Sequence, residues 1–145
     1  MIPAPRHSVS VAAVVVDDTD RVLVIRRRDN GAWQLPGGVL ELNETPEDGM
    51  RREVSEETGV EVRAERLTGV YKNVKLGVIA LVFRARLLAG TPHPTDEAAA
   101  VEWWPAHRVA SDMDEAFAVR ILDALRAEPT PAVRTHDGVR LLDHS

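Results

Sequence analysis

Apolar residues along the chain fall into short runs rich in valine and isoleucine, separated by polar turns and by one longer polar stretch. The runs 8–16 and 21–27 are joined by four polar residues and predict a β-hairpin. Residues 60–70, 75–88 and 98–104 predict three further strands, and the middle of these is apolar enough for a central position in a sheet. The chain therefore begins with strands and continues with more of them.

Two segments carry helical signals instead. Thr45 is a suitable N-cap, Pro46 suits a first helical turn, and Gly59 can end a helix in the left-handed conformation, so residues 46–58 predict a helix. A second helix is predicted from residue 111 or 112 to residue 127. Its apolar side, which we expect to face the core, carries Phe117, Ile121, Leu122 and Leu125.

The order of strands, helix, strands and helix predicts an α+β fold with a mixed β-sheet between helices. We expect residues 1–127 to form this domain and residues 128–145 to be a C-terminal tail packed on it or extending from it. Residues 133–142 predict a short hairpin around His136, Asp137 and Gly138. His136 and Asp137 could form a catalytic pair, but a surface turn is the preferred interpretation, and the tail is assigned no chemistry.

Composition excludes several classes of protein. The 145 residues carry a formal net charge of −5, which argues against a surface for long nucleic acid. The chain contains no cysteine, so disulfides and thiolate zinc sites are impossible. The first six residues lack an apolar secretory core, and no apolar run reaches membrane-spanning length. We therefore expect a cytoplasmic protein with no membrane contact.

The helix predicted at residues 46–58 has an unusual acidic side. Glu53, Glu56 and Glu57 stand at positions i, i+3 and i+4, so three mutually repelling carboxylates share one face. A solvated acidic surface is one interpretation, and a platform for a hard divalent cation such as Mg²⁺ is the other. The adjacent arginines and the pair Gly37-Gly38, which predicts a tight turn with exposed carbonyl groups, favour the metal.

At this point the segment resembles the Nudix box, a pattern of glycine, glutamate, arginine and aliphatic positions spread over 23 residues. Its specified positions are all filled, by Gly38, Glu44, Arg52, Glu53, Val54, Glu56, Glu57, Gly59 and Val60. The resemblance implies a Nudix-type α/β/α sandwich over roughly residues 8–127. It also implies a hydrolase that cleaves a nucleoside diphosphate linked to another group, by attack of water on phosphorus with Mg²⁺ or Mn²⁺ bound.

The resemblance also assigns roles to single residues. Glu56 and Glu57 would be the primary metal ligands, completed by the backbone carbonyl of Gly37. Glu53 would bind metal or accept the proton of the attacking water. The identity of this general base is open, because in some members of the family it comes from a later loop. Glu97 is the candidate in that loop, with a solvated surface acid as the alternative.

Other box residues would support the site. Arg52 would hold the glutamates in position and pair with Glu44, which keeps the acids from raising one another's pKa. Gly38 would also support the site. Glu41 would lie next to these residues, and a structural role is as acceptable for it as a functional one.

Substrate contacts are harder to assign. A predicted strand ends beside the glycine pair with Arg26, Arg27 and Arg28. Because side chains alternate along a strand, at least one of them could contact a phosphate, and we choose Arg27. The alternative is that all three are surface charges. Tyr71 and Lys72 are expected in a loop, where they could stack on a base or contact phosphate, or pack locally.

The neighbouring Trp103 and Trp104 must face opposite ways on a strand, so one of them is a candidate for the cleft or for a partner. Together with the family resemblance, this is compatible with a homodimer. Core packing is the alternative for each ring.

Residues 75–78 lack the proline and the tyrosine that mark two substrate classes in the family, so we expect a nucleoside triphosphate or a similar small nucleotide as the substrate. ADP-ribose or another nucleotide sugar is the alternative substrate. A different class also stays open, a Nudix-like module that senses a nucleotide or sugar nucleotide without cleaving it. The intact set of box acids favours the enzyme.

Overall fold

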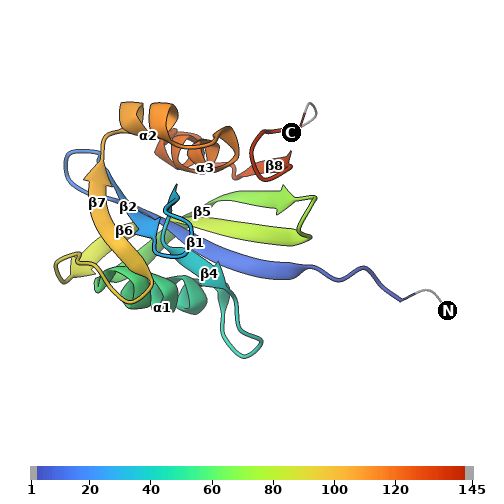
Figure 1. The fold of residues 1–145 in the computed structure, drawn as a ribbon, viewed down its shortest axis with the longest axis horizontal. Coiled ribbons are helices and arrows are strands. Elements are labelled where there is room, and N and C mark those ends of the chain that lie inside the picture. Colours follow the sequence, from blue (N-terminus) through green and yellow to red (C-terminus); the bar gives the residue numbers. More distant parts are fainter. Residues whose placement is uncertain (1–2, 143–145) are drawn as a thin grey trace.

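The computed structural model describes residues 3–142 and shows three layers (Figure 1). A mixed sheet lies between helix α1 (Pro46–Thr58) on one face and helices α2 (Ala106–Asp112) and α3 (Glu115–Leu125) on the other. The predicted α+β class and the sandwich are confirmed. Among residues 3–142, no helix is both long enough and apolar enough to cross a membrane.

The sheet is built around its first strand. The strands are β1 (Ser8–Val16), β2 (Val22–Arg27), β3 (Trp33–Gln34), β4 (Gly37–Val39), β5 (Glu61–Asn73), β6 (Val78–Ala89), β7 (Ala98–Trp104) and β8 (Ala132–His136). They run in the order β3-β2-β1-β6-β5-β8, while β4 pairs with β1 and β7 with β2. The β1–β6 and β5–β8 pairs are parallel and the others antiparallel. The predicted hairpin exists, but β1 meets β2 in register only at Val16 and Val22, because β1 pairs along its length with β6.

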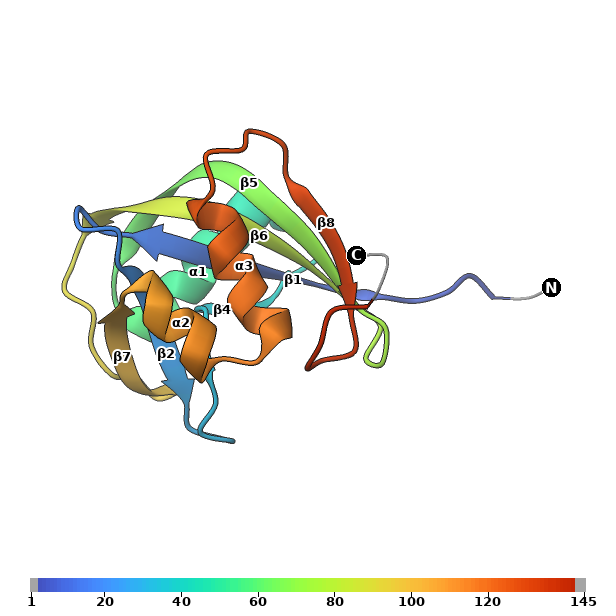
Figure 2. The ribbon, with the colours of Figure 1, turned by 90° about the horizontal axis from the view of Figure 1, so that it is seen from above.

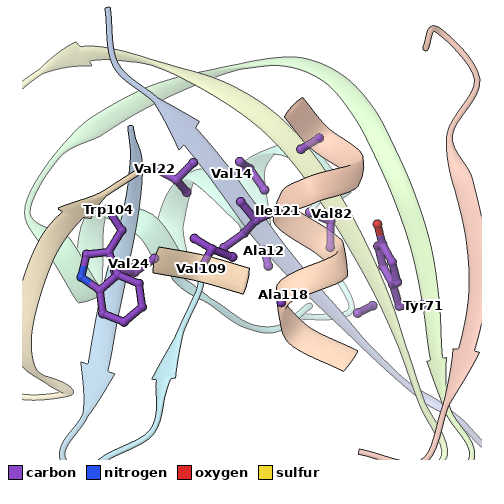
Figure 3. Packing of buried hydrophobic residues seen from close by; sticks show 12 residues of the cluster. Ala12, Val14, Val22, Val24, Tyr71, Val82, Trp104, Val109, Ala118 and Ile121 are labelled. Atoms are coloured by element: carbon purple, nitrogen blue, oxygen red, sulfur yellow. The ribbon is translucent and has the colours of Figure 1, made fainter. Parts of the chain in front are cut away.

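Alternation along β1 divides the core into two halves. Val11 and Val15 face α1, where Met50 and Val54 are fully buried. The opposite side of the strand faces α3, and Figure 3 shows the apolar side chains gathered between that helix and the sheet. Each face of the sheet thus has its own helical layer. Helix α1 packs on the face opposite to α3.

Helix α1 has the bounds that its sequence predicts, because its signals are local. The Thr45 side chain accepts a hydrogen bond from the Asp48 N–H, and Gly59 ends the helix with a φ of 79°. The glutamates of the box are thereby placed on a helix of fixed length.

The single helix predicted from residue 111 or 112 to 127 is wrong. The chain forms two helices there, α2 and α3, and Met113 between them is extended. Leu122, expected in the core, is 39% exposed, and the residues of α3 that are buried include Ala116, Ala118, Ile121 and Ala124. Small side chains on this face let α3 lie close to the sheet.

Residues 71 and 72 do not lie in a loop, as expected, but in β5. Tyr71 is fully buried beside α3 (Figure 3). Its hydroxyl donates a hydrogen bond of 2.7 Å to Asp123. The turn that follows is made by Asn73, whose side-chain oxygen accepts the N–H groups of Lys75 and Leu76. The strand therefore continues for three residues beyond its predicted end.

The tail is a part of the sheet. Strand β8 runs parallel to β5 at the edge of the sheet, as Figure 2 shows, and His136 at its end forms a bridge with Leu141. The predicted turn at residues 136–138 is present, but His136 is fully buried. Arg134 of β8 binds Asp123 of α3 through two hydrogen bonds of 2.8 and 2.7 Å. A strand and a buried ion pair therefore cross the boundary expected at residue 127.

Candidate active site

Two glutamates of α1 lie against β4. Glu57 accepts a hydrogen bond of 2.7 Å from the Gly37 N–H, and a Cβ atom at Gly38 would lie 2.5 Å from the carboxyl carbon of Glu53. The glycines thus allow a close approach of α1 to the strand. The predicted tight turn at Gly37-Gly38 is wrong, since both residues are extended in β4 and paired with β1.

The register of β4 bears on the carbonyl group of Gly37. In an antiparallel pair, residues bonded to the partner strand alternate with residues that are not. The Ala13 N–H bonds to the Pro36 carbonyl and the Leu40 N–H to the Val9 carbonyl, so Gly37 is at a position not bonded to β1. Both of its backbone groups therefore point away from β1, on the side where its N–H meets Glu57. Its proposed role as a metal ligand stays a prediction that agrees with this direction.

A loop of the second half of the chain brings Glu97 to the same place. The Thr95 hydroxyl donates a 3.0 Å hydrogen bond to the Glu57 carbonyl at the end of α1. Arg28 holds the loop from the other side, through its side chain to the Thr95 carbonyl and through its backbone N–H to the Glu97 carbonyl. Sequence reasoning missed Thr95 and considered Arg28 only as a phosphate contact or a surface charge, because their contacts here join residues 38 and 67 positions apart.

Three carboxylates converge as a result. Oxygen atoms of Glu53, Glu57 and Glu97 all lie within 4.8 Å of one another. Burial, together with Glu53 and Glu97, raises the pKa of Glu57 to about 8, against the hydrogen bond from Gly37. Burial also raises the pKa of Glu53, although Arg52 opposes the shift. Such a cluster of hard oxygen donors is suited to a divalent cation, which would relieve this repulsion.

Glu56, the other predicted ligand, lies outside this cluster. Its carboxylate is half-exposed and lies 3.4 Å from Arg52. Helical spacing brings Glu53 and Glu57 together, whereas the arginine draws Glu56 aside.

Arg52 lies among the acidic residues, and the pairing with Glu44 that the resemblance implies is present. It binds both carboxylate oxygens of Glu44, at 3.0 and 2.7 Å, and reaches Glu53 at 2.9 Å. The Val39 carbonyl accepts a further bond, which ties the guanidinium to β4. Hydrogen bonding to Arg52 lowers the pKa of Glu44 to about 2. Glu41 meets Glu44 through its backbone, donating its N–H to the Glu44 carboxylate and accepting the Glu44 N–H at its carbonyl oxygen.

A cleft of about 260 Å³ adjoins the cluster on the α3 side of the sheet. Its lining includes Ser10, Arg27, Gln34, Gly37, Phe117 and Arg120. Arg27 is exposed, pairs with Asp29, and interacts electrostatically with Glu57 and Glu97. Of the arginines at the end of β2, Arg27 is therefore the one that joins the acidic cluster to the cleft.

The other predicted substrate contacts fare differently. Tyr71 is fully buried and bonded to Asp123, so its ring packs locally and is not available to a nucleotide base. Lys72 is half-buried in β5, and its contact with phosphate stays a prediction. Trp104 is fully buried, and Trp103 packs against the α1 side of the core, so neither ring provides an open stacking surface. Phe117 and Arg120 in the cleft were not assigned any chemistry by the sequence, because Phe117 was counted as core.

The α/β/α sandwich thus carries a cluster of carboxylates beside β4 and a cleft. Together they define a candidate cation site. The model of the NUDIX domain family matches residues 6–125. A "MutT-like protein" of Streptomyces ambofaciens is 54% identical over 138 residues, which cover 95% of this chain and 89% of the relative. The chain therefore belongs to the Nudix family and is a Nudix hydrolase.

A second relative matches this chain in sequence, and a solved structure matches it in fold. An "ADP-ribose pyrophosphatase" of Methanocaldococcus jannaschii is 32% identical over 97 residues, which cover 62% of this chain and 57% of the relative. The crystal structure of a NUDIX hydrolase from Nitrosomonas europaea has a TM-score of 0.76 at 24% identity, and the match covers 94% of this chain and 83% of that one. Nudix hydrolases act on small nucleotide substrates and generally use divalent metal ions, which is consistent with the acidic cluster.

Proposed function

We propose that this Nudix hydrolase uses Mg²⁺, or Mn²⁺ in its place, to cleave the diphosphate linkage of a nucleoside triphosphate or a similar small nucleotide. The observation that carries the proposal is the convergence of Glu53, Glu57 and Glu97 within 4.8 Å beside the cleft. A bound divalent cation would neutralise charge on the diphosphate and lower the pKa of water. The linkage is split when water adds to one phosphorus and the bond from that phosphorus to the bridging oxygen breaks.

Glu53 and Glu57 would hold the cation, with the Gly37 carbonyl. Glu56 stays in the proposal as a further ligand, because a half-exposed side chain one turn from Glu53 can change rotamer without disturbing the core. Arg52 would keep the acids ionised and oriented, as its bonds to Glu44 and Glu53 indicate. These residues bind and orient, and of them only Glu56 needs to change its side-chain conformation.

Glu97 is the best placed proton acceptor. One oxygen of Glu53 is bonded to Arg52, and one oxygen of Glu57 is bonded to Gly37. Within residues 3–142 no hydrogen-bond donor is bound to the carboxylate of Glu97, which is exposed where water can reach it. A free, hydrated carboxylate next to the cation-binding pair is suited to take the proton of the attacking water.

Arg27 would meet the phosphates at the mouth of the cleft. It is exposed, and its guanidinium is bonded only to the exposed Asp29 among the residues that the structure describes. A phosphate group offers it a stronger bidentate partner than this surface ion pair does.

The test is a hydrolysis panel of purified protein with and without Mg²⁺. It contains the nucleoside triphosphates, ADP-ribose, a nucleotide sugar and a dinucleoside polyphosphate, with the Glu57→Gln variant as the control for contaminating enzymes. Release of a nucleoside monophosphate from a triphosphate, dependent on Mg²⁺ and on Glu57, is the expected result. Cleavage of ADP-ribose alone would transfer the proposal to the alternative substrate. Compounds that raise the melting temperature and are never cleaved would replace the enzyme with a sensor.

The cytoplasmic location and the homodimer also stay predictions. The mass of the protein in solution, measured by light scattering, tests the second.

A further inference from the structure

Arg120 on α3 is a buried cation that has no counter-ion among residues 3–142. Its guanidinium carbon lies 5.1 Å from the centre of the Tyr71 ring and 5.0 Å from that of Phe117. Its Nε atom is buried and has no hydrogen-bond partner among residues 3–142. Burial lowers the pKa of Arg120 to about 10, so the side chain is still charged at neutral pH. A buried charge of this kind costs stability unless something pairs with it.

The carboxylates near Arg120 are committed elsewhere. Asp123, one turn along α3, is bound by Tyr71 and by both guanidinium nitrogens of Arg134 that face it. Asp137 accepts the backbone N–H groups of Val139 and Arg140. Within the described chain, no carboxylate forms an ion pair with Arg120.

The other polar neighbours of Arg120 satisfy its donors only in part. His136 lies 3.2 Å from a terminal nitrogen of Arg120 through Nε2, and its Nδ1 lies 2.9 Å from the Gly138 N–H. Burial and the charge of Arg120 lower the pKa of His136, so the ring is neutral and carries one proton. Whichever nitrogen carries it, one of the two contacts joins two donors. Asn73, which also lines the cleft, uses its side-chain oxygen in the turn and leaves only its NH₂ group.

Arg120 and Phe117 both line the cleft, whose lining also includes Gly37 and Gly38, the glycines that contact Glu57 and Glu53. A ligand there would complete this side of the site if it presented two adjacent acceptor atoms to the guanidinium and a flat face to the ring. Guanine offers such an edge through O6 and N7, whereas adenine places its N6 amino donor at the corresponding position. Aromatic rings stack on either base without preference.

We propose that Arg120 reads the base of the substrate and makes the enzyme selective for guanine over adenine nucleotides, while Phe117 stacks on the base. This inference rests on the proposed function, because it takes the diphosphate to lie at the acidic cluster. Guanine and adenine nucleotides match in size and charge, so a difference between them isolates the base edge from the fit of the cleft.

The experiment compares kcat/KM for GTP, ATP, ITP and 7-deaza-GTP in the wild type, Arg120→Met and Phe117→Leu. Wild type should prefer GTP over ATP by about 10- to 100-fold, the discrimination expected of one bidentate arginine contact. ITP, which retains O6 and N7, should keep the preference, and 7-deaza-GTP, which lacks N7, should lose most of it. Arg120→Met should remove the preference, and Phe117→Leu should weaken both purines alike.

Thermal unfolding separates a reading role from a structural one. Arg120→Met removes an uncompensated buried charge, so its melting temperature should equal or exceed that of the wild type. Arg134→Met is the matched control, because it leaves Asp123 buried without its bidentate partner and should melt lower. A fall in melting temperature for Arg120→Met as large as that of the control would mean that the arginine is structural, and would overturn the inference.

Equilibrium binding of the monophosphates GMP and AMP distinguishes this inference from the proposed function. Hydrolysis with equal kcat/KM for GTP and ATP, or a preference that survives in Arg120→Met, overturns the inference and leaves the function. Tighter binding of GMP than of AMP that depends on Arg120, in a protein that hydrolyses nothing, supports the inference and overturns the function. Absence of both binding and hydrolysis overturns both.

Discussion

At the scale of single residues, Arg52 and Glu57 show two ways of placing charge beside β4. Arg52 is surrounded by carboxylates and a carbonyl group. Its hydrogen bonds to Glu44 keep that carboxylate ionised and lower its pKa to about 2. Glu57 is 7% exposed, and it has one backbone N–H and two other acids as neighbours, so its pKa rises to about 8. Hydrogen bonding to Arg52 thus favours the ionised form of Glu44. Burial beside two other acids disfavours the ionised form of Glu57, which a bound cation would stabilise.

Glu97 and Glu53 can be told apart by how their variants respond to Mg²⁺. If Glu97 accepts the proton, Glu97→Gln should lower kcat by about 10²- to 10⁴-fold, and a higher Mg²⁺ concentration should not restore it. Glu53→Gln should instead weaken cation binding, so its loss should shrink as Mg²⁺ rises. Asp96→Asn, at the exposed neighbouring acid, is the matched control and should keep wild-type rates. Nearly full turnover in Glu97→Gln, with a loss of orders of magnitude in Glu53→Gln at all Mg²⁺ concentrations, would move the base to α1.

At the scale of elements, the loop before β7 is fixed to the end of α1 by one hydroxyl group. Thr95 donates to the Glu57 carbonyl and accepts from the Ala98 N–H, so it joins the helix, the loop and the strand. The direction of the Glu97 side chain depends on this junction.

Replacing Thr95 by valine keeps the shape of the side chain and removes both hydrogen bonds. Each is worth about 1 kcal/mol, so the free energy of unfolding in urea should fall by about 1–3 kcal/mol. The value of kcat should fall as well, because Glu97 is no longer held beside Glu57. Thr95→Ser retains the hydroxyl and should recover most of the rate. Equal rates for the valine and serine variants would show that the loop does not position Glu97.

Elements differ in how far the sequence could predict them. Helix α1 was predicted to the residue because Thr45, Pro46 and Gly59 act within one turn of its ends. The end of β5 was missed because Tyr71 is held by Asp123, 52 positions away, and Glu97 could be named only as a candidate because its loop is held by a contact 38 positions away. The box motif supplied the acids of α1, but it carries no information on the arginine that lines the cleft from α3.

Strand β8 provides the second prediction at this scale. Asp123 is 5% exposed and is bound by Arg134 and Tyr71, so Arg134→Met leaves a buried charge without its main partner. The free energy of unfolding should fall by about 3–5 kcal/mol. Arg126→Met, which removes an exposed arginine 3.3 Å from the same carboxylate, should cost about 1 kcal/mol or less. Equal losses in the two variants, measured by urea unfolding, would mean that β8 is not needed to hold α3.

At the scale of the whole molecule, the active site and the cleft lie on different layers of the sandwich. The acids belong to α1 and to the loop before β7, the cleft is lined by α3, and β4 is the strand that touches both. A nucleotide that spans them would contact both faces of the sheet, so binding should stabilise the fold as a unit. The same argument applies to the cation alone, because Glu57 is buried between α1 and β4.

Metal-free protein should therefore become less stable as the pH rises. The pKa of Glu57 is 4.5 in an unfolded chain and about 8 in the folded one, so the folded state binds more protons between these values. Its contribution to the free energy of unfolding is then greatest below pH 4.5 and is lost as the pH rises to about 8. Glu57→Gln has no such proton to lose, so the difference between wild type and variant, measured by urea unfolding in EDTA, isolates this residue from all other acids.

Mg²⁺ should reverse the loss at pH 8. A ligand that binds only the folded state stabilises it by about 2.7 kcal/mol when present at 100 times its Kd. The wild type should show a gain of this order on titration with Mg²⁺, and Glu57→Gln should show a smaller one at the same concentrations. KCl at the same ionic strength serves as the control for general screening of charge. If the wild type and Glu57→Gln gained equally from Mg²⁺, the three carboxylates would not be the place where the cation binds.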